Sequence, residues 1–195
     1  MKQWPFQLFG AITTLILLSG CATTSRDSFR VPLGNSGQIS LLSPQDLPRL
    51  NGAHMVTINH DGKKEMFIGE LHIDRRSIRL DASSLLGPSL FEVSDEDGRL
   101  HSRPACAFTE PGLVIAMLEL VLARRQALVE SLHGLILREQ RGSRGKRVRD
   151  VYEQGHLILH IVISSKPAAQ ATIFMTMPQE HLSILMQPLI HQGHP

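Results

Sequence analysis

Alternating apolar and polar positions mark a run of β-strands in the first half of the chain. Phe67, Leu71 and Ile73 fall on one parity of "EMFIGELHID", and Ile78 and Leu80 do the same in "SIRLDASS". A period of two places these side chains on one face of each strand. Two Asp-Gly dipeptides in the same region are typical of two-residue hairpin turns. The pattern therefore predicts an antiparallel meander whose apolar face is covered by another element.

A different pattern begins at Pro111, in "PGLVIAMLELVLARRQALVESLHG". Nine of the ten residues from Leu113 to Leu122 are apolar, the exception being Glu119, and β-branched residues become fewer. This composition predicts a helix that is buried on every side. It is too short to cross a bilayer, which takes about twenty residues. We expect it to lie against the apolar face of the sheet, with residues 123–132 forming a more polar second helix or turn.

Further short apolar runs follow the helical segment: "GLILREQ", "RVRDVYEQ", "HLILHIVIS", "QATIFMTM" and "HLSILMQPLI". Each contains β-branched residues and is bounded by glycine, serine or proline. Together with the first strands they predict an α+β fold, mainly antiparallel β, in which one curved sheet of roughly ten strands wraps around one or two apolar helices. An all-β barrel without the inner helix is the alternative architecture.

The N-terminus has the pattern of a bacterial secretory signal, with Lys2, an apolar core and small residues before Cys21. The run "LSGC" resembles the lipobox of bacterial lipoproteins, which implies that Cys21 is acylated and becomes the new N-terminus. Ala22 after the cysteine implies sorting to the outer membrane. An ordinary signal peptide with an incidental cysteine is the alternative.

This reading gives a lipoprotein signal peptide over residues 1–20, an acylated N-terminus and tether over 21–50, and one domain over 51–195. The tether is predicted from its content of Ser, Thr, Pro, Gly and Asn, with room for a short edge strand or helix near its end. Removing the signal lowers the formal net charge from +2 to +1, because Lys2 is its only charged residue. A near-neutral domain gives no reason to expect nucleic acid as a partner.

No motif for catalysis or metal binding stands out. Cys106 is the only thiol besides Cys21, so no intramolecular disulfide is expected. His156 and His160 have the spacing of helical metal ligands, but in a β-type run they are about 13 Å apart. The acids of "SDEDG" and the basic residues around "RGSRGKR" are typical of solvated turns, and neither G-x-S-x-G nor a P-loop occurs. We therefore expect no enzyme, no metal site and no cofactor.

A family resemblance rests on "FIGELHIDRRSIRLDASSLLGPSLFEVSDEDGRL", on the apolar helix and on "GHLILHIVIS". These stretches resemble the LolB outer-membrane receptors, which accept lipoproteins from a periplasmic carrier, and a family of LolB-like bacterial lipoproteins. In LolB, a strand with Arg-Leu leads into an exposed loop ending in Leu-Gly; here Arg79-Leu80 precede the loop and Leu86-Gly87 end it. The resemblance implies an unclosed half β-barrel, like LolA and LolB, with helices over a hydrophobic cavity. Genes of the LolB-like family often lie beside aryl polyene biosynthesis clusters, which implies a lipid cargo.

The loop "SSLLGP" places Leu85 and Leu86 where the chain reverses in water. A leucine inserted into a bilayer recovers about 2 kcal/mol of transfer free energy. The resemblance implies the same use, since the matching LolB leucine is thought to contact the membrane. We therefore predict a membrane-contact tip at Leu85 and Leu86. The alternative is that both leucines fold back onto the core.

An acyl-chain cavity is predicted between the sheet and the apolar helix. Its candidate lining residues come from both elements: Phe67, Leu71, Ile73, Ile78, Leu80, Val93, Met117, Leu118, Val121 and Leu122. The alternative is that the same residues form a close-packed core. A basic loop supplies the candidates for contact with anionic headgroups or an acidic carrier: Arg141, Arg144, Lys146 and Arg147.

From these observations we expect a lipid-binding or lipoprotein-handling module on the periplasmic face of the outer membrane, anchored by Cys21. Its expected partners are membrane lipid or acyl chains, together with a periplasmic carrier protein or a lipoprotein cargo, and we expect a monomer. The alternative is a non-catalytic scaffold lipoprotein that binds a protein partner.

Overall fold

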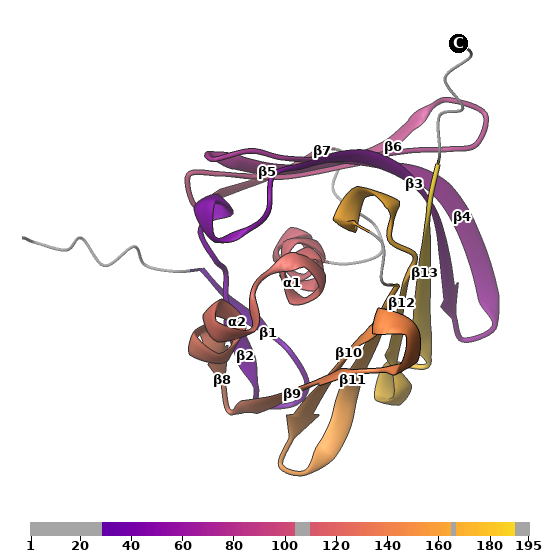
Figure 1. Ribbon diagram of the computed structural model, residues 1–195. Helices are drawn as coiled ribbons and strands as arrows, with labels where there is room; N and C mark the ends of the chain where they lie inside the picture. Colours follow the sequence, from indigo (N-terminus) through magenta and orange to yellow (C-terminus); the bar gives the residue numbers. More distant parts are fainter. Residues whose placement is uncertain (1–28, 104–109, 165–166, 190–195) are drawn as a thin grey trace, which may run out of the picture.

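The computed structural model describes residues 29–103, 110–164 and 167–189, and it has one large sheet wrapped around a central helix (Figure 1). The large sheet has ten antiparallel strands in the order β7-β6-β5-β4-β3-β13-β12-β11-β10-β9. Its edge strands β7 and β9 are not paired with each other, so the barrel is open. This arrangement confirms the predicted class and excludes a barrel without an inner helix.

The elements of the large sheet are β3 (Leu50–His60), β4 (Lys63–Ile73), β5 (Ser77–Ser83), β6 (Ser89–Glu96), β7 (Arg99–Arg103), β9 (Leu135–Arg141), β10 (Arg147–Glu153), β11 (His156–Ile163), β12 (Ile173–Met177) and β13 (Leu182–Pro188). A small sheet in the order β1-β2-β8 contains β1 (Arg30–Pro32), β2 (Gln38–Ser40) and β8 (Leu132–His133). The helices are α1 (Pro111–Leu122) and α2 (Arg125–Ser131), and the short 3-10 turns are η1 (Pro44–Asp46), η2 (Ser143–Gly145), η3 (Ala168–Gln170) and η4 (Pro178–Glu180).

Two-residue turns fix the register of the hairpins. Asp61 and Asp97 have positive φ angles of 49° and 51°, and the glycine that follows each of them is also positive. Positive φ at both central positions is the geometry of a type I′ turn, which matches the twist of the flanking strands. Both hairpins predicted from Asp-Gly are confirmed. The β10–β11 hairpin uses Gln154 and Gly155 in the same way, with φ angles of 49° and 86°.

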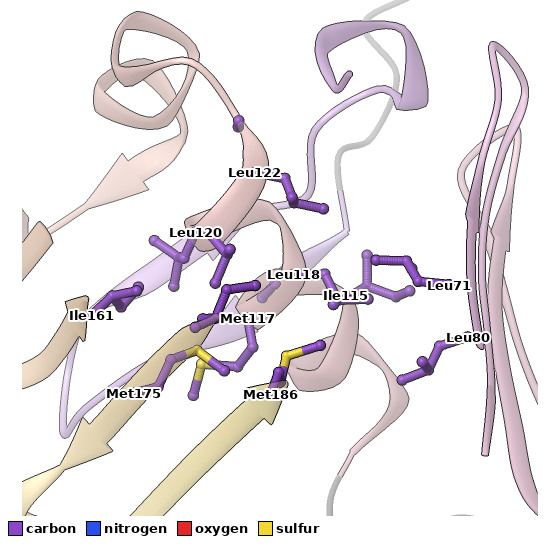
Figure 2. Close-up of a cluster of buried hydrophobic side chains, with 14 of the residues drawn as sticks. Leu71, Leu80, Ile115, Met117, Leu118, Leu120, Leu122, Ile161, Met175 and Met186 are labelled. Atoms are coloured by element: carbon purple, nitrogen blue, oxygen red, sulfur yellow. The ribbon is translucent and has the colours of Figure 1, made fainter. Parts of the chain in front are cut away.

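Helix α1 fills the space inside the curved sheet. Nine of its residues are buried, on every side of the helix, as its composition predicts. Figure 2 shows Ile115 of α1 facing Leu71 of β4, while Met117 lies beside Met175 and Met186 of the opposite strands. Burial against both halves of the sheet stabilises the helix, because each fully buried aliphatic side chain contributes about 1.5–3 kcal/mol.

The C-terminal end of α1 is held by a buried arginine on β10. The guanidinium of Arg149 is fully buried and donates to the carbonyl oxygens of Leu120, Val121 and Ala123. Its Nε donates to Glu139 Oε2 at 2.6 Å. A cation at this end of a helix satisfies carbonyls that lack intrahelical partners and favourably meets the negative end of the dipole. The prediction that the basic stretch is solvated is therefore wrong at Arg149.

Residues 29–50, which were assigned to the tether, belong to the folded domain, and the short strand or helix expected near the end of that segment is present as β2 and η1. Val31, Leu33 and Ile39 are buried, and the small sheet lies with α2 on the side where the large sheet is open (Figure 1). The loop between β1 and β2 is clamped by Glu153, whose carboxylate accepts hydrogen bonds from the backbone N–H groups of residues 35–37. These bonds hold the pKa of Glu153 down to about 2. The polar composition of this segment hid its place in the fold, because only a few apolar residues, such as Val31, Leu33 and Ile39, are buried in it.

Neither of the two helices in the described residues is long and apolar enough to cross a membrane.

Candidate functional site

The hairpins of the large sheet turn at two opposite ends, which we name by their loops. The pairings Leu182 with His60 and Leu182 with Met177 place the β3–β4, β5–β6, β10–β11 and β12–β13 turns together; this is the tip end. The β4–β5, β6–β7, β9–β10 and β11–β12 turns lie at the other end, the basic end. The two loops predicted to carry function therefore lie at opposite ends of the strands.

The tip end carries exposed leucines. Leu86 is 94% exposed and Leu85 is 51% exposed, so neither folds back onto the core. The loop is closed by hydrogen bonds from Ser84 N to Pro88 O and from Gly87 N to Ser84 O. Gly87 has a φ of 103°, a conformation open to glycine and costly for other residues. The turn thus presents both leucines on a defined backbone, and Leu90 and Met66 nearby on β6 and β4 are exposed as well.

The ten predicted cavity-lining residues are all buried, as expected, but most of them pack against one another. The Phe67 and Phe91 rings meet edge to face with centroids 5.7 Å apart. Figure 2 shows Leu71 and Leu80 directed at α1 from the sheet. Between β4, β5 and the N-terminal part of α1, the interior is a packed core rather than an open cavity. Of the ten residues, Val121 and Leu122 line a cavity, and this cavity lies at the other end of α1.

That cavity has a volume of about 480 Å³ and lies at the basic end, between the end of α1 and strands β9–β12. The cavity brings together Val121 and Leu122 of the predicted acyl-chain site and Arg141 and Arg147 of the predicted headgroup site. Its lining residues are Pro48, Val121, Leu122, Glu139, Arg141, Gly145, Arg147, Ile163, Ser164, Ala171 and Ile173.

Apolar side chains and two arginines, Arg141 and Arg147, line the cavity, and we call the part formed by the arginines its mouth. Arg147 is half-buried; its Nη2 donates to Val121 O at 2.9 Å, while its Nε is buried and has no partner among the described residues. Arg141 is exposed, and Lys146 is exposed without lining the cavity. The side chain of Arg144 lies outside the described residues. The loop is therefore more than a solvated turn, because Arg147 is built into the cavity wall.

Two buried side chains with unpartnered polar atoms were not predicted as site residues. Glu119 is fully buried; its Oε1 accepts a hydrogen bond from Leu42 N at 3.0 Å, and its Oε2 has no partner among the described residues. Burial raises the pKa of Glu119 to about 9, opposed by the Leu42 hydrogen bond. His54 on β3 is also buried, neither ring nitrogen has a described partner, and burial lowers its pKa. Glu119 was visible in the sequence as the lone acid of an apolar run, whereas His54 gave no signal.

The remaining polar candidates are placed as follows. His156 and His160 lie on the strand β11, and the His160 Nδ1 atom is 2.6 Å from Asp150 Oδ1. Asp95 is buried and accepts a hydrogen bond from Gly98 N at 2.8 Å, so reading it as a solvated turn residue was wrong. In the described part of the chain, no three His, Cys, Asp or Glu side chains are grouped to hold a metal ion. Cys21 and Cys106 lie outside the described residues.

A protein-family model matches most of the chain. Residues 52–189 match the model of a family described as "Protein of unknown function (DUF3261)". A search of curated proteins finds nothing that matches. The matched region begins near the predicted start of the domain and contains the large sheet, α1 and nearly all of the cavity wall. The chain therefore belongs to the DUF3261 family.

Proposed function

We propose that the protein is an outer-membrane lipoprotein with a LolB-like domain, which binds acyl chains in order to transfer or place a lipid, lipoprotein or aryl polyene lipid. The observation that carries the proposal is the cavity at the end of α1. Its volume of about 480 Å³ falls in the range of roughly 300–1,000 Å³ common for small-molecule sites. An open antiparallel sheet around an apolar helix supports the proposed likeness to LolA and LolB.

The cavity has the chemistry that a hydrocarbon chain requires. Val121, Leu122, Ile163, Ala171 and Ile173 supply apolar walls. Apolar area removed from water contributes about 25 cal/mol per Å². A buried tail has no polar groups, so it leaves none unpaired inside the protein.

Attachment to the membrane follows from the lipobox and the tip. With Cys21 acylated, eight residue steps join it to Phe29, the first described residue, and a fully extended chain of this length reaches at most about 29 Å. The folded N-terminal segment thus makes the connection much shorter than a tether ending at residue 50. A domain held this close brings Leu85 and Leu86 within reach of the bilayer surface.

The test is extraction of bound lipid from protein that lacks its anchor. A chain beginning at residue 22 keeps every described contact; it is purified without detergent, extracted with organic solvent and examined by mass spectrometry. We expect acyl-chain species in near-stoichiometric amount. Ala171→Phe, which fills the cavity, should remove most of them. Ala53→Phe, the same change on the outer side of β3, should retain them. Wild-type protein without any acyl species would refute the proposal.

The scaffold alternative has one observation in its favour. Phe174 is exposed on the outer side of β12, and the strand register places it between Leu185 of β13 and Val162 of β11. An apolar row on an outer sheet face suits a protein partner. This alternative predicts an empty cavity and a protein partner in pull-downs that is lost with Phe174→Glu.

A further inference from the structure

We infer that the cavity binds a single-chain amphiphile with an anionic head, the head at Arg141 and Arg147 and the tail against the end of α1. This inference rests on the proposed function and narrows it to one class of ligand. It follows from the charge at the mouth, from the unused hydrogen-bonding capacity of Arg147 and from the apolar walls behind both arginines.

The mouth of the cavity carries an excess of positive charge. Arg141 and Arg147 line it directly, and Glu139 is the only acid among its lining residues. The Glu139 carboxylate is already engaged by Arg149, whose Nε lies 2.6 Å from Oε2. That ion pair removes most of the repulsion that an incoming anion would meet. Two guanidinium groups are then left without an acidic partner that lines the cavity.

Helix α1 exerts an opposing influence, because the C-terminal end of a helix favours cations. Its terminal carbonyl groups are already occupied: Arg149 donates to three of them, and Arg147 donates to Val121 O. The negative end of the dipole is therefore compensated from within the fold. A ligand in the cavity would therefore meet the positive charge of Arg141 and Arg147 rather than the negative end of the helix dipole.

The guanidinium of Arg147 has a buried N–H donor, at Nε, without a hydrogen-bond partner among the described residues. Its Nη2 is used by Val121 O, but its buried Nε–H has no partner among the described residues. A buried donor without a partner is unfavourable, so an anionic head that draws the Arg147 guanidinium toward the cavity would relieve this cost. A carboxylate or phosphate matches the fork of a guanidinium, and such charge-assisted bonds are among the strongest in proteins.

The apolar walls explain why the ligand carries a chain. Besides the arginines, the cavity is lined by Val121 and Leu122 of α1 and by Ile163 and Ile173 of β11 and β12. An inorganic anion would leave this surface hydrated, whereas a hydrocarbon tail would cover it. Head and tail together therefore account for both halves of the cavity.

The experiment is calorimetric titration of the chain beginning at residue 22 with ligands that share one tail. Dodecanoate, dodecyl phosphate and dodecyltrimethylammonium are compared below their micelle concentrations, with inorganic phosphate as the headgroup alone. We expect both anionic amphiphiles to bind at least about tenfold more tightly than the cation. Inorganic phosphate should bind far more weakly than dodecyl phosphate.

Variants locate the head. Arg147→Gln and Arg141→Gln should each weaken dodecanoate binding by about tenfold, and Arg141 is exposed, so its variant keeps the fold. Arg138→Gln removes the same charge from the same hairpin, where Arg138 stacks on Tyr152 away from the cavity, and it should bind like wild type. Equal binding of anionic and cationic amphiphiles, or phosphate binding as tightly as dodecyl phosphate, overturns this inference alone. Failure of every amphiphile to bind overturns the proposed function as well.

Discussion

Replacing Glu119 by glutamine should make the protein more stable at neutral pH. Glu119 is fully buried in α1 and its pKa is raised to about 9, so the folded protein holds its proton across the physiological range. In the unfolded chain the same carboxyl ionises near its ordinary pKa of 4.5. Glutamine keeps the shape and the acceptor for Leu42 N but has no proton to lose.

The sign and size of the effect follow from linkage. Because the folded pKa is the higher one, stability from this residue is fully present below pH 4.5 and is lost as the pH rises toward 9. The loss is at most about 1.4 kcal/mol per pH unit. Between pH 4.5 and pH 7 it therefore reaches about 3 kcal/mol. The Glu119→Gln protein should escape this loss.

The assay is urea unfolding followed by circular dichroism at several pH values from 5 to 8. Other titrating groups are common to both proteins, so the difference between their free energies of unfolding isolates Glu119. The advantage of Glu119→Gln should be small at pH 5 and should grow at each step toward pH 8. Glu65→Gln, the same change at an exposed position, should show no such trend. A difference for Glu119→Gln that stays flat from pH 5 to 8 would mean that the folded protein already ionises Glu119.

Three further predictions follow from the same structure. Arg149→Met should lower the free energy of unfolding by about 3–5 kcal/mol in urea titrations, because it leaves Glu139 and the Leu120 and Ala123 carbonyls without this donor; a loss below about 1 kcal/mol would contradict the role of Arg149. Glu153→Gln should melt at a lower temperature than wild type at pH 7. The difference in melting temperature should close as the pH falls from 4.5 to about 2, because the lowered pKa of Glu153 means that its ionised form provides the stabilisation. A difference that stays constant over this pH range would contradict the prediction. Leu86→Glu should change the free energy of unfolding by less than about 0.5 kcal/mol yet reduce flotation with lipid vesicles. Ile136→Glu, at another exposed site, should leave flotation unchanged. Equal flotation of the two variants would contradict membrane contact at Leu86.

The sheet and the inner helix could be predicted because their patterns are local. Period-two alternation marks strands such as β4 and β5, and Asp-Gly pairs mark two of the turns. The apolar run of α1 is conspicuous for the same reason, since one window of sequence contains it. Strand order beyond neighbouring hairpins was not visible. The pairing of β13 with β3 joins segments more than a hundred residues apart.

The parts that sequence reasoning misplaced depend on contacts between distant residues. Arg149 belongs to a basic stretch that looks solvated, and only its place beside the end of α1 makes it a buried cap. Glu153 holds the loop at residues 35–37, which lies more than a hundred residues earlier in the chain. The cavity was predicted between the sheet and the apolar helix, where large side chains from both elements fill most of the space. It lies instead where α1 ends, a position that no periodicity encodes.

The opposite placement of the tip and the cavity constrains how the proposed lipid handling would proceed. Strand β5 alone covers seven residues, or about 23 Å, which shows how far apart the tip end and the basic end of the sheet lie along this strand. With the tip in the bilayer, the mouth faces the periplasm, and an anionic amphiphile would enter without crossing the headgroup layer. Release into the membrane requires the basic end to approach it. In the proposed anchoring, at most about 29 Å of chain would join an acylated Cys21 to Phe29. Under the proposed function, loading and release would therefore require two orientations of the domain at the membrane, and insertion of the leucine tip would favour the loading one.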